Sequence, residues 1–219
     1  MKKLKAYTLM EVMVVMIIMI ILLGLSFSAY TSFIETTKFN EDVSVLQHDI
    51  LIIQRASMLM ERNDQEDWIY GLGIDLGGLE YSVGSGDGTY SFFKWCSSSA
   101  DYGTEETKAK YPGGEDVQIP MNSYTDDYQC VSNPNELVSL IGYGYGSLNL
   151  KEDVYIVNSN IQFIVFESVS GRTFMYDSDG FRVDTDLEIR FNKNSGESKI
   201  LTVKNLTGRT KLSDVVESE

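Results

Sequence analysis

The chain has 219 residues, of which 32 are acidic and 18 basic, so its formal net charge is -14 at pH 7. This balance argues against tight, general binding to nucleic acid, because such binding is dominated by basic side chains that contact phosphate. The length suits one globular domain preceded by a membrane anchor.

A short basic segment followed by a long apolar one begins the chain. Lys2, Lys3 and Lys5 precede an almost unbroken apolar run over residues 7–29, which contains one acid, Glu11. A run of roughly 20 apolar residues is long enough to cross a bilayer as a helix, with the basic end in the cytoplasm. A cleaved signal peptide or a plain signal anchor would account for the lysines and the run, but neither accounts for an acid inside the run.

The residues around this acid resemble the processing site of type IV prepilins and type II secretion pseudopilins. In that family a basic leader ends in a small residue, an aromatic residue begins the mature chain, and a glutamate is its fifth residue. Ala6, Tyr7 and Glu11 hold these positions here, with Ala6 for the usual glycine and Tyr7 for the usual phenylalanine. The resemblance implies that prepilin peptidase removes residues 1–6, that Tyr7 becomes the N-methylated terminus, and that Glu11 neutralises the terminal amine of a neighbouring subunit during assembly.

The helical pattern continues beyond the membrane-spanning run. One helix is predicted over residues 7–62, with the membrane anchor at 7–29, weak points at Gly24 and over 35–42, and an amphipathic second half, as in the pilin architecture. Residues at spacings of three and four predict a stripe that packs on a sheet: Val43, Leu46, Ile50, Ile53, Ser57 and Met60. Residues 63–66 are predicted to form the loop that leaves the helix.

From residue 63 onward the pattern becomes strand-like. Short runs rich in aromatic and β-branched residues alternate with Gly, Asn, Asp and Ser, which predicts a mainly antiparallel sheet. These runs cover residues 68–74, 89–95, 154–157, 161–167, 172–176, 186–191 and 199–203, with turns at 177–180 and 192–196. The predicted fold class is therefore α+β, a long N-terminal helix followed by an extracytoplasmic β-rich domain over 63–219.

A polar segment over about residues 97–135 carries all three prolines and shows no strand pattern. We interpret it as a loop insertion in the β domain and as the place to expect a specific partner surface. The only two cysteines, Cys96 and Cys130, lie close to its ends. Since an exported domain meets an oxidising compartment, we expect a Cys96–Cys130 disulfide, with two buried free thiols as the alternative.

The remaining motifs do not indicate catalysis or a cofactor. Glycine-rich stretches at 84–88 and 142–146 are not followed by a helical pattern, so turns are favoured over phosphate-binding loops. The only histidine, His48, lies on the helix, and the cysteines lack zinc-site spacing, so no metal or cofactor is predicted. A calcium ion held by loop carboxylates such as those at 177–180 stays an alternative. No pattern joins a nucleophile to a base, and we expect no enzyme.

Near the C-terminus, residues 203–212 are similar to the end of GspH-like and FimT-like pseudopilins and minor pilins, in which a late strand leads into a Gly-Arg element. Some FimT-like minor pilins bind DNA through that element. Arg209 and Lys211 hold the corresponding positions here, but acids follow them and the whole chain is negative. Both features oppose contact with phosphate, so DNA is a disfavoured partner.

Together, these resemblances imply a structural and assembly protein: a minor pilin or pseudopilin of a type IV pilus-like or type II secretion-like filament. Its partners would be prepilin peptidase, other pilin or pseudopilin subunits, a membrane assembly platform and, before assembly, membrane lipid. The chain would cross the inner or cytoplasmic membrane once, with a cytoplasmic N-terminus and a periplasmic or extracellular β domain. A major pilin and a DNA-uptake minor pilin are the alternatives.

Overall fold

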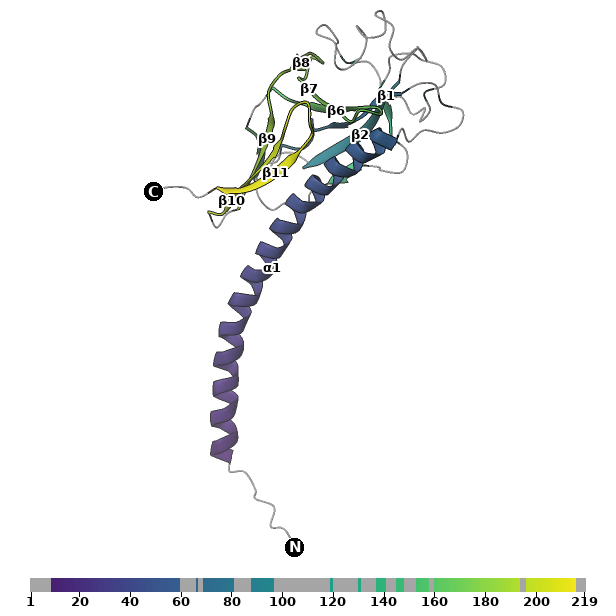
Figure 1. Cartoon of the computed structure of the whole chain (residues 1–219). Helices are drawn as coiled ribbons and strands as arrows, with labels where there is room; N and C mark the ends of the chain where they lie inside the picture. The colour runs from purple at the N-terminus through teal and green to yellow at the C-terminus, as the bar shows by residue number, and fades with distance from the viewer. Residues whose placement is uncertain are drawn as a thin grey trace, which may run out of the picture. The chain divides into compact units, whose positions relative to one another are not determined.

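A computed structural model describes residues 9–59, 66, 69–80, 88–96, 119, 130, 137–140, 145–147, 153–157, 160–193 and 196–215 (Figure 1). Its helix is α1 (Leu9–Leu59), and its strands are β1 (Ile69–Asp75), β2 (Thr89–Cys96), β3 (Leu137–Ser139), β4 (Tyr145–Ser147), β5 (Asp153–Ile156), β6 (Phe163–Glu167), β7 (Thr173–Tyr176), β8 (Arg182–Val183), β9 (Leu187–Asn192), β10 (Ser198–Val203) and β11 (Thr210–Val215). The strands pair antiparallel in two sheets, which confirms the predicted α+β class.

Helix α1 is continuous through Gly24 and through the polar stretch 35–42. By length and composition its N-terminal part could cross a membrane. The large apolar side chains between Leu9 and Phe33 are exposed. Contacts divide the chain into two compact units, one ending at Glu41 and one beginning at Asp42. The second part of α1 therefore belongs to the β unit, while the first part offers an apolar surface that lipid or protein must cover.

The predicted stripe on the second part of α1 is confirmed. Val43, Leu46, Ile50, Ile53 and Ser57 are all fully buried, and Met60 lies outside the described residues. Two polar contacts fix this part of the helix on the larger sheet. The Ser57 hydroxyl donates to the Phe166 carbonyl at 2.7 Å, and the Tyr90 hydroxyl donates to Asp49 Oδ2 at 2.6 Å.

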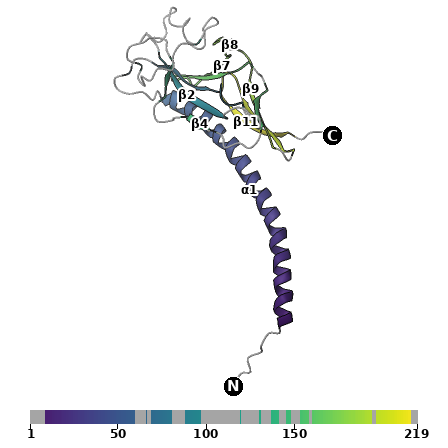
Figure 2. The same cartoon turned by 180° about the vertical axis from the view of Figure 1, so that it is seen from behind.

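The larger sheet has the strand order β3-β2-β1-β6-β7-β8, and β4 also pairs with β2. Figure 2 shows β4 beside β2, where it pairs with the stretch Thr89–Ser91, while β3 pairs farther along, at Phe93 to Trp95. In the central strand β1, Gly73 lies opposite Phe93. A Cβ atom at Gly73 would lie 2.2 Å from the Phe93 ring, so this close approach requires glycine.

The two faces of the larger sheet are covered by different parts of the chain. One face of the sheet is turned toward α1, because the Tyr90 hydroxyl on this face donates a hydrogen bond to Asp49 of the helix. Since side chains alternate along a strand, this face also carries Phe92 and Lys94. The other face carries an aromatic core that also includes one residue of the 97–135 segment, Ile119. Its members are Tyr70, Phe93, Trp95, Ile119, Leu137, Phe163, Val165, Phe174 and Tyr176. The helix and this part of the insertion thus enclose the sheet between them.

The smaller sheet has the strand order β11-β10-β9-β5. Along β9, Leu187, Ile189 and Phe191 are fully buried, whereas the residues between them are half-buried. This alternation is typical of an antiparallel sheet with one face in a core.

All seven predicted strand runs contain a strand, but four of the strands within the described residues were not predicted. Strands β3, β4 and β8 have two or three residues each, too few for a periodic pattern. The prediction of a turn over 142–146 is wrong at Tyr145 and Gly146, which lie in β4 because the edge of β2 supplies hydrogen-bonding partners. Residues 84–87 lie outside the described part of the chain, and Gly88, with φ of 60°, has the backbone of a turn residue.

Candidate functional site

Glu11, the acid of the apolar run, lies in the first turn of α1. Its sequence neighbours Met10 and Val12 are exposed, as is Glu11 itself. A carboxylate is favoured here by the helix dipole, whose positive end is the N-terminus. Ala6 and Tyr7, the predicted processing residues, lie outside the described residues. The described residues therefore place one carboxylate at the start of a long helix whose apolar side chains are exposed.

The predicted disulfide is confirmed. Cys96, the last residue of β2, is bonded to Cys130, and both are buried. Their Cα atoms are 5.3 Å apart. The alternative of two free thiols is therefore wrong.

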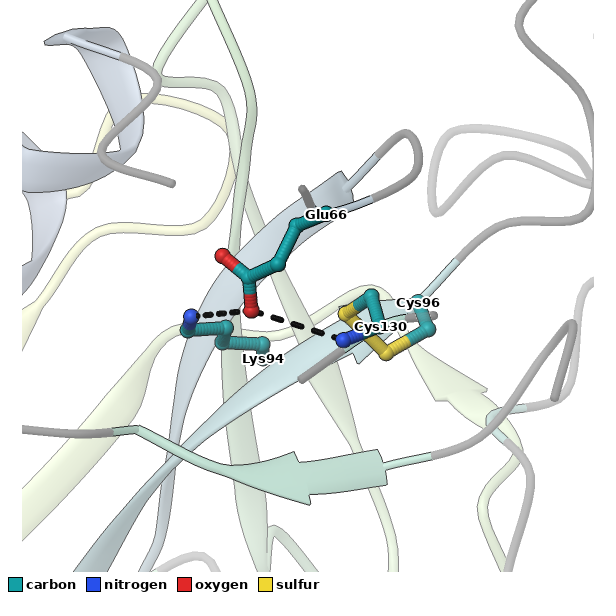
Figure 3. The surroundings of a disulfide bond; sticks show 4 residues. All are labelled: Glu66, Lys94, Cys96 and Cys130. Atoms are coloured by element: carbon teal, nitrogen blue, oxygen red, sulfur yellow. Dashed lines mark hydrogen bonds and ion pairs between the residues drawn. A yellow bond between two sulfur atoms is a disulfide. The ribbon is translucent and has the colours of Figure 1, made fainter. Parts of the chain in front are cut away.

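Beside this disulfide lies a buried ion pair that the sequence analysis did not predict (Figure 3). Glu66 Oε1 accepts a hydrogen bond from Lys94 Nζ at 2.6 Å and one from the Cys130 backbone amide at 3.4 Å. The Glu66 side chain is 0% exposed and the Lys94 side chain 4%. One carboxylate thus joins the segment after α1, strand β2 and the end of the insertion. The signal in the sequence was Lys94, a cation between aromatic residues on the helix-facing side of β2.

Of the 97–135 insertion, the structure describes Ile119 and Cys130. Ile119 is buried in the aromatic core, and its backbone amide donates to the Gly180 carbonyl at 3.0 Å. Both described residues are therefore anchors to the domain. The prediction of a partner surface concerns residues outside the described part of the chain.

The predicted turn over 177–180 is present. Asp177 Oδ1 accepts hydrogen bonds from the backbone amides of Asp179 at 3.0 Å and Phe181 at 2.8 Å. This carboxylate oxygen therefore shapes the turn, as in an Asx-turn. Among the described residues there is no group of three His, Cys, Asp or Glu side chains that could hold a metal ion. His48 is exposed on α1.

Arg209 and Lys211, the candidate DNA-binding residues, are exposed on the β10–β11 hairpin. They are two residues apart, so their side chains share one face. Neither forms an ion pair with another described residue. Lys204, opposite Arg209 at the hairpin end, pairs with Asp186 at 2.5 Å, and this contact raises the pKa of Lys204 and lowers that of Asp186. Uncompensated positive charge on this face therefore comes from Arg209 and Lys211.

Two hairpin turns meet the end of α1. Gln54 Nε2 donates to the Gly171 carbonyl at 3.2 Å, in the β6–β7 turn, and to the Thr207 carbonyl at 2.9 Å, in the β10–β11 turn. In addition, the Val169 amide donates to the Ser57 carbonyl at 3.2 Å. One glutamine thus holds both turns against the last two turns of the helix.

Each of these turns carries a bulky residue with positive φ, Val169 at 68° and Leu206 at 65°. The left-handed region costs a non-glycine residue roughly 1–2 kcal/mol, and outliers of this kind cluster at functional sites. Nevertheless, Val169 is 55% exposed and Leu206 is 51% exposed. Met58, which is 46% exposed, lies against the β6–β7 turn, where a Cβ on Gly171 would be 2.3 Å from Met58 Cε. We call the four exposed apolar residues Met58, Leu59, Val169 and Leu206 the helix-end surface.

Comparisons of this chain with protein-family models, curated proteins and solved structures found no match.

Proposed function

We propose that this chain is a minor pilin or pseudopilin, an assembly subunit of a type IV pilus-like or type II secretion-like filament. The observation that carries the proposal is Glu11, the fifth residue after the Ala6–Tyr7 junction and the acid within an exposed apolar helix. The helix is apolar enough to cross a membrane and is exposed along its N-terminal part. These features support a subunit that is inserted in the membrane before assembly and then packs this helix against other subunits.

Cleavage before Tyr7 would create a new amino terminus four residues from Glu11. An ammonium and a carboxylate 4 Å apart attract each other by about 1 kcal/mol in water and by about 4 kcal/mol at an effective dielectric constant of 20. Between packed apolar helices this attraction is strong, and an unpaired charge is costly. Glu11 of one subunit would thus select the processed terminus of its neighbour and fix their register.

The experiment is to express the full chain with a prepilin peptidase and to determine the mature N-terminus by mass spectrometry. We expect Tyr7 as the first residue, methylated at its amine. Replacing Ala6 with Leu should block cleavage, because the family has a small residue before the cut, and should leave membrane insertion unchanged. An intact Met1, or cleavage after Ala29, would contradict the proposal. The abundance of the chain in isolated filaments would separate a minor from a major subunit.

DNA uptake is a second candidate function, favoured by the exposure of Arg209 and Lys211 on one face of a hairpin. A gel-shift assay would compare the wild type with Arg209→Ala/Lys211→Ala, and Lys199→Ala is the matched control because Lys199 pairs with Asp214 at 3.6 Å. DNA binding lost in the double variant but kept in the control would support this function. If the wild type does not bind DNA, or if both variants lose DNA binding equally, DNA uptake is excluded as the function.

A further inference from the structure

The helix-end surface is exposed, apolar and held in place. Gln54 bonds both turns that carry it, and a Cβ on Gly208 would lie 2.5 Å from Gln54 Nε2, so the β10–β11 turn is packed closely on the helix. Val169 and Leu206 keep bulky side chains where glycine would fit the backbone better. A surface prepared in this way loses little conformational entropy on binding. These features indicate a binding surface rather than a folding requirement.

Positive charge borders this surface. Arg55 is three residues before Met58 and four before Leu59 on α1, so these side chains are neighbours on the helix, and Arg209 follows Gly208 in the turn that Gln54 holds; both arginines are exposed. Neither is in an ion pair with another described residue. Because the whole chain has a net charge of -14, two uncompensated arginines beside an apolar surface are a local exception. The fitting partner therefore combines large apolar side chains with a carboxylate.

The chain itself contains such a partner segment in the first unit of α1. Tyr30, Phe33, Thr37 and Glu41 follow one another at spacings of three and four, so they share one helix face. Tyr30, Phe33 and Glu41 are exposed. This face therefore presents two aromatic side chains and, about two turns farther along, one carboxylate.

We propose that the helix-end surface of one copy binds residues 30–41 of α1 from a second copy. Met58, Leu59, Val169 and Leu206 cover Tyr30 and Phe33, and Arg55 or Arg209 pairs with Glu41. The contact rests on the proposed function, since it joins neighbouring subunits of a filament. It also gives the Arg209 side chain a protein partner in place of DNA.

The test is site-specific photocrosslinking of the full chain in membranes of cells that assemble it. A benzophenone amino acid replaces Met58, and crosslinked peptides are mapped by mass spectrometry. We expect dimers in which position 58 is joined to residues 30–41 of the second copy. The control position is Phe181, which is 56% exposed against 46% for Met58 but lies outside the surface, and it should give no link to 30–41. Links from position 58 to lipid, to another protein or to another part of the chain would overturn the proposal.

Two further variants separate binding from folding. Val169→Gly/Leu206→Gly removes two contact residues and relieves both positive-φ positions, so the crosslink yield should fall about tenfold while thermal stability stays equal or rises. Arg55→Glu/Arg209→Glu should also lower the yield, and a second copy with Glu41→Arg should restore it. An unchanged yield in the glycine variant, or no recovery in the charge exchange, would overturn the contact. Tyr7 as the mature terminus, measured in the same cells, tests the proposed function independently.

Discussion

Two residues beside the disulfide, Glu66 and Lys94, show how strongly a buried charge can affect the stability of the folded chain. Both side chains are almost inaccessible to solvent, and Glu66 Oε1 and Lys94 Nζ lie 2.6 Å apart, so each neutralises the charge of the other. A buried ion pair adds little over an apolar pair of the same volume, but removal of one partner leaves an uncompensated charge in the core.

Replacing Glu66 with Gln should therefore lower the free energy of unfolding by about 3–5 kcal/mol. The double variant Glu66→Gln/Lys94→Met should recover much of this loss, because no ion is then buried. Urea unfolding of the full chain in detergent, followed by near-ultraviolet circular dichroism, measures both. The control is Asp214→Asn, which removes a carboxylate that is 77% exposed in its pair with Lys199, and about 0–1 kcal/mol is expected there. Equal effects at the two pairs would contradict the importance of burial.

Two buried tyrosines make the stability depend on alkaline pH. Burial raises the pKa of both Tyr90 and Tyr176, and the hydrogen bond to Asp49 raises the pKa of Tyr90 further. The folded chain thus keeps these protons where the unfolded chain releases them, above about pH 10. The stability that they contribute is fully present below that pH and is lost as the pH rises.

We expect the free energy of unfolding to fall above pH 10 by up to about 1.4 kcal/mol per pH unit for each tyrosine. The variants Tyr90→Phe and Tyr176→Phe should each flatten this decline. Tyr155→Phe, at an exposed tyrosine of β5, should not. Midpoints of thermal unfolding between about pH 8 and pH 11 provide the measurement. A decline of the same slope in all three variants would assign the effect to other groups.

At the scale of the elements, the second part of α1 has one buried side and one exposed side. Ile50 is fully buried against the sheet, whereas the next residue, Leu51, is 42% exposed. A side chain that fills the core leaves a cavity when it is truncated, but a surface side chain does not.

Ile50→Ala should accordingly lower the free energy of unfolding by about 2–5 kcal/mol. Leu51→Ala, a truncation of the same size one residue away, should cost less than about 1 kcal/mol. Thermal or urea unfolding of the full chain measures the difference. Comparable losses at both positions would mean that Leu51 is also covered in the isolated protein.

For the whole molecule, the proposed function divides α1 into a part that assembles and a part that folds. The unit that begins at Asp42 contains both sheets, while the unit that ends at Glu41 contains Glu11 and the exposed apolar rod. Substitutions in the part of α1 that ends at Glu41 should therefore affect assembly and leave the folding of the β unit unchanged.

Glu11→Gln keeps the size of the side chain and removes its charge. We expect normal cleavage before Tyr7 but at least about a tenfold loss of incorporation, equivalent to about 1.4 kcal/mol, because the new amine lacks its counter-ion. The fraction of the chain that sediments with sheared filaments measures incorporation. Glu80→Gln, at an exposed acid of the β unit, is the control and should assemble normally. Filament entry of the Glu11 variant at the wild-type level would contradict the assigned role.

The sequence by itself determined the features that depend on neighbours along the chain. The apolar run and the buried stripe from Val43 to Ser57 follow from helical periodicity, and the long strands follow from their runs of aromatic and branched residues. Tertiary structure alone decided the rest: the Glu66–Lys94 pair, strands β3 and β4 on the edge of β2, and the hydrogen bonds by which Gln54 of α1 holds both the β6–β7 and the β10–β11 turn. Each of these joins residues far apart in the chain, and local periodicity contains no information about such partners.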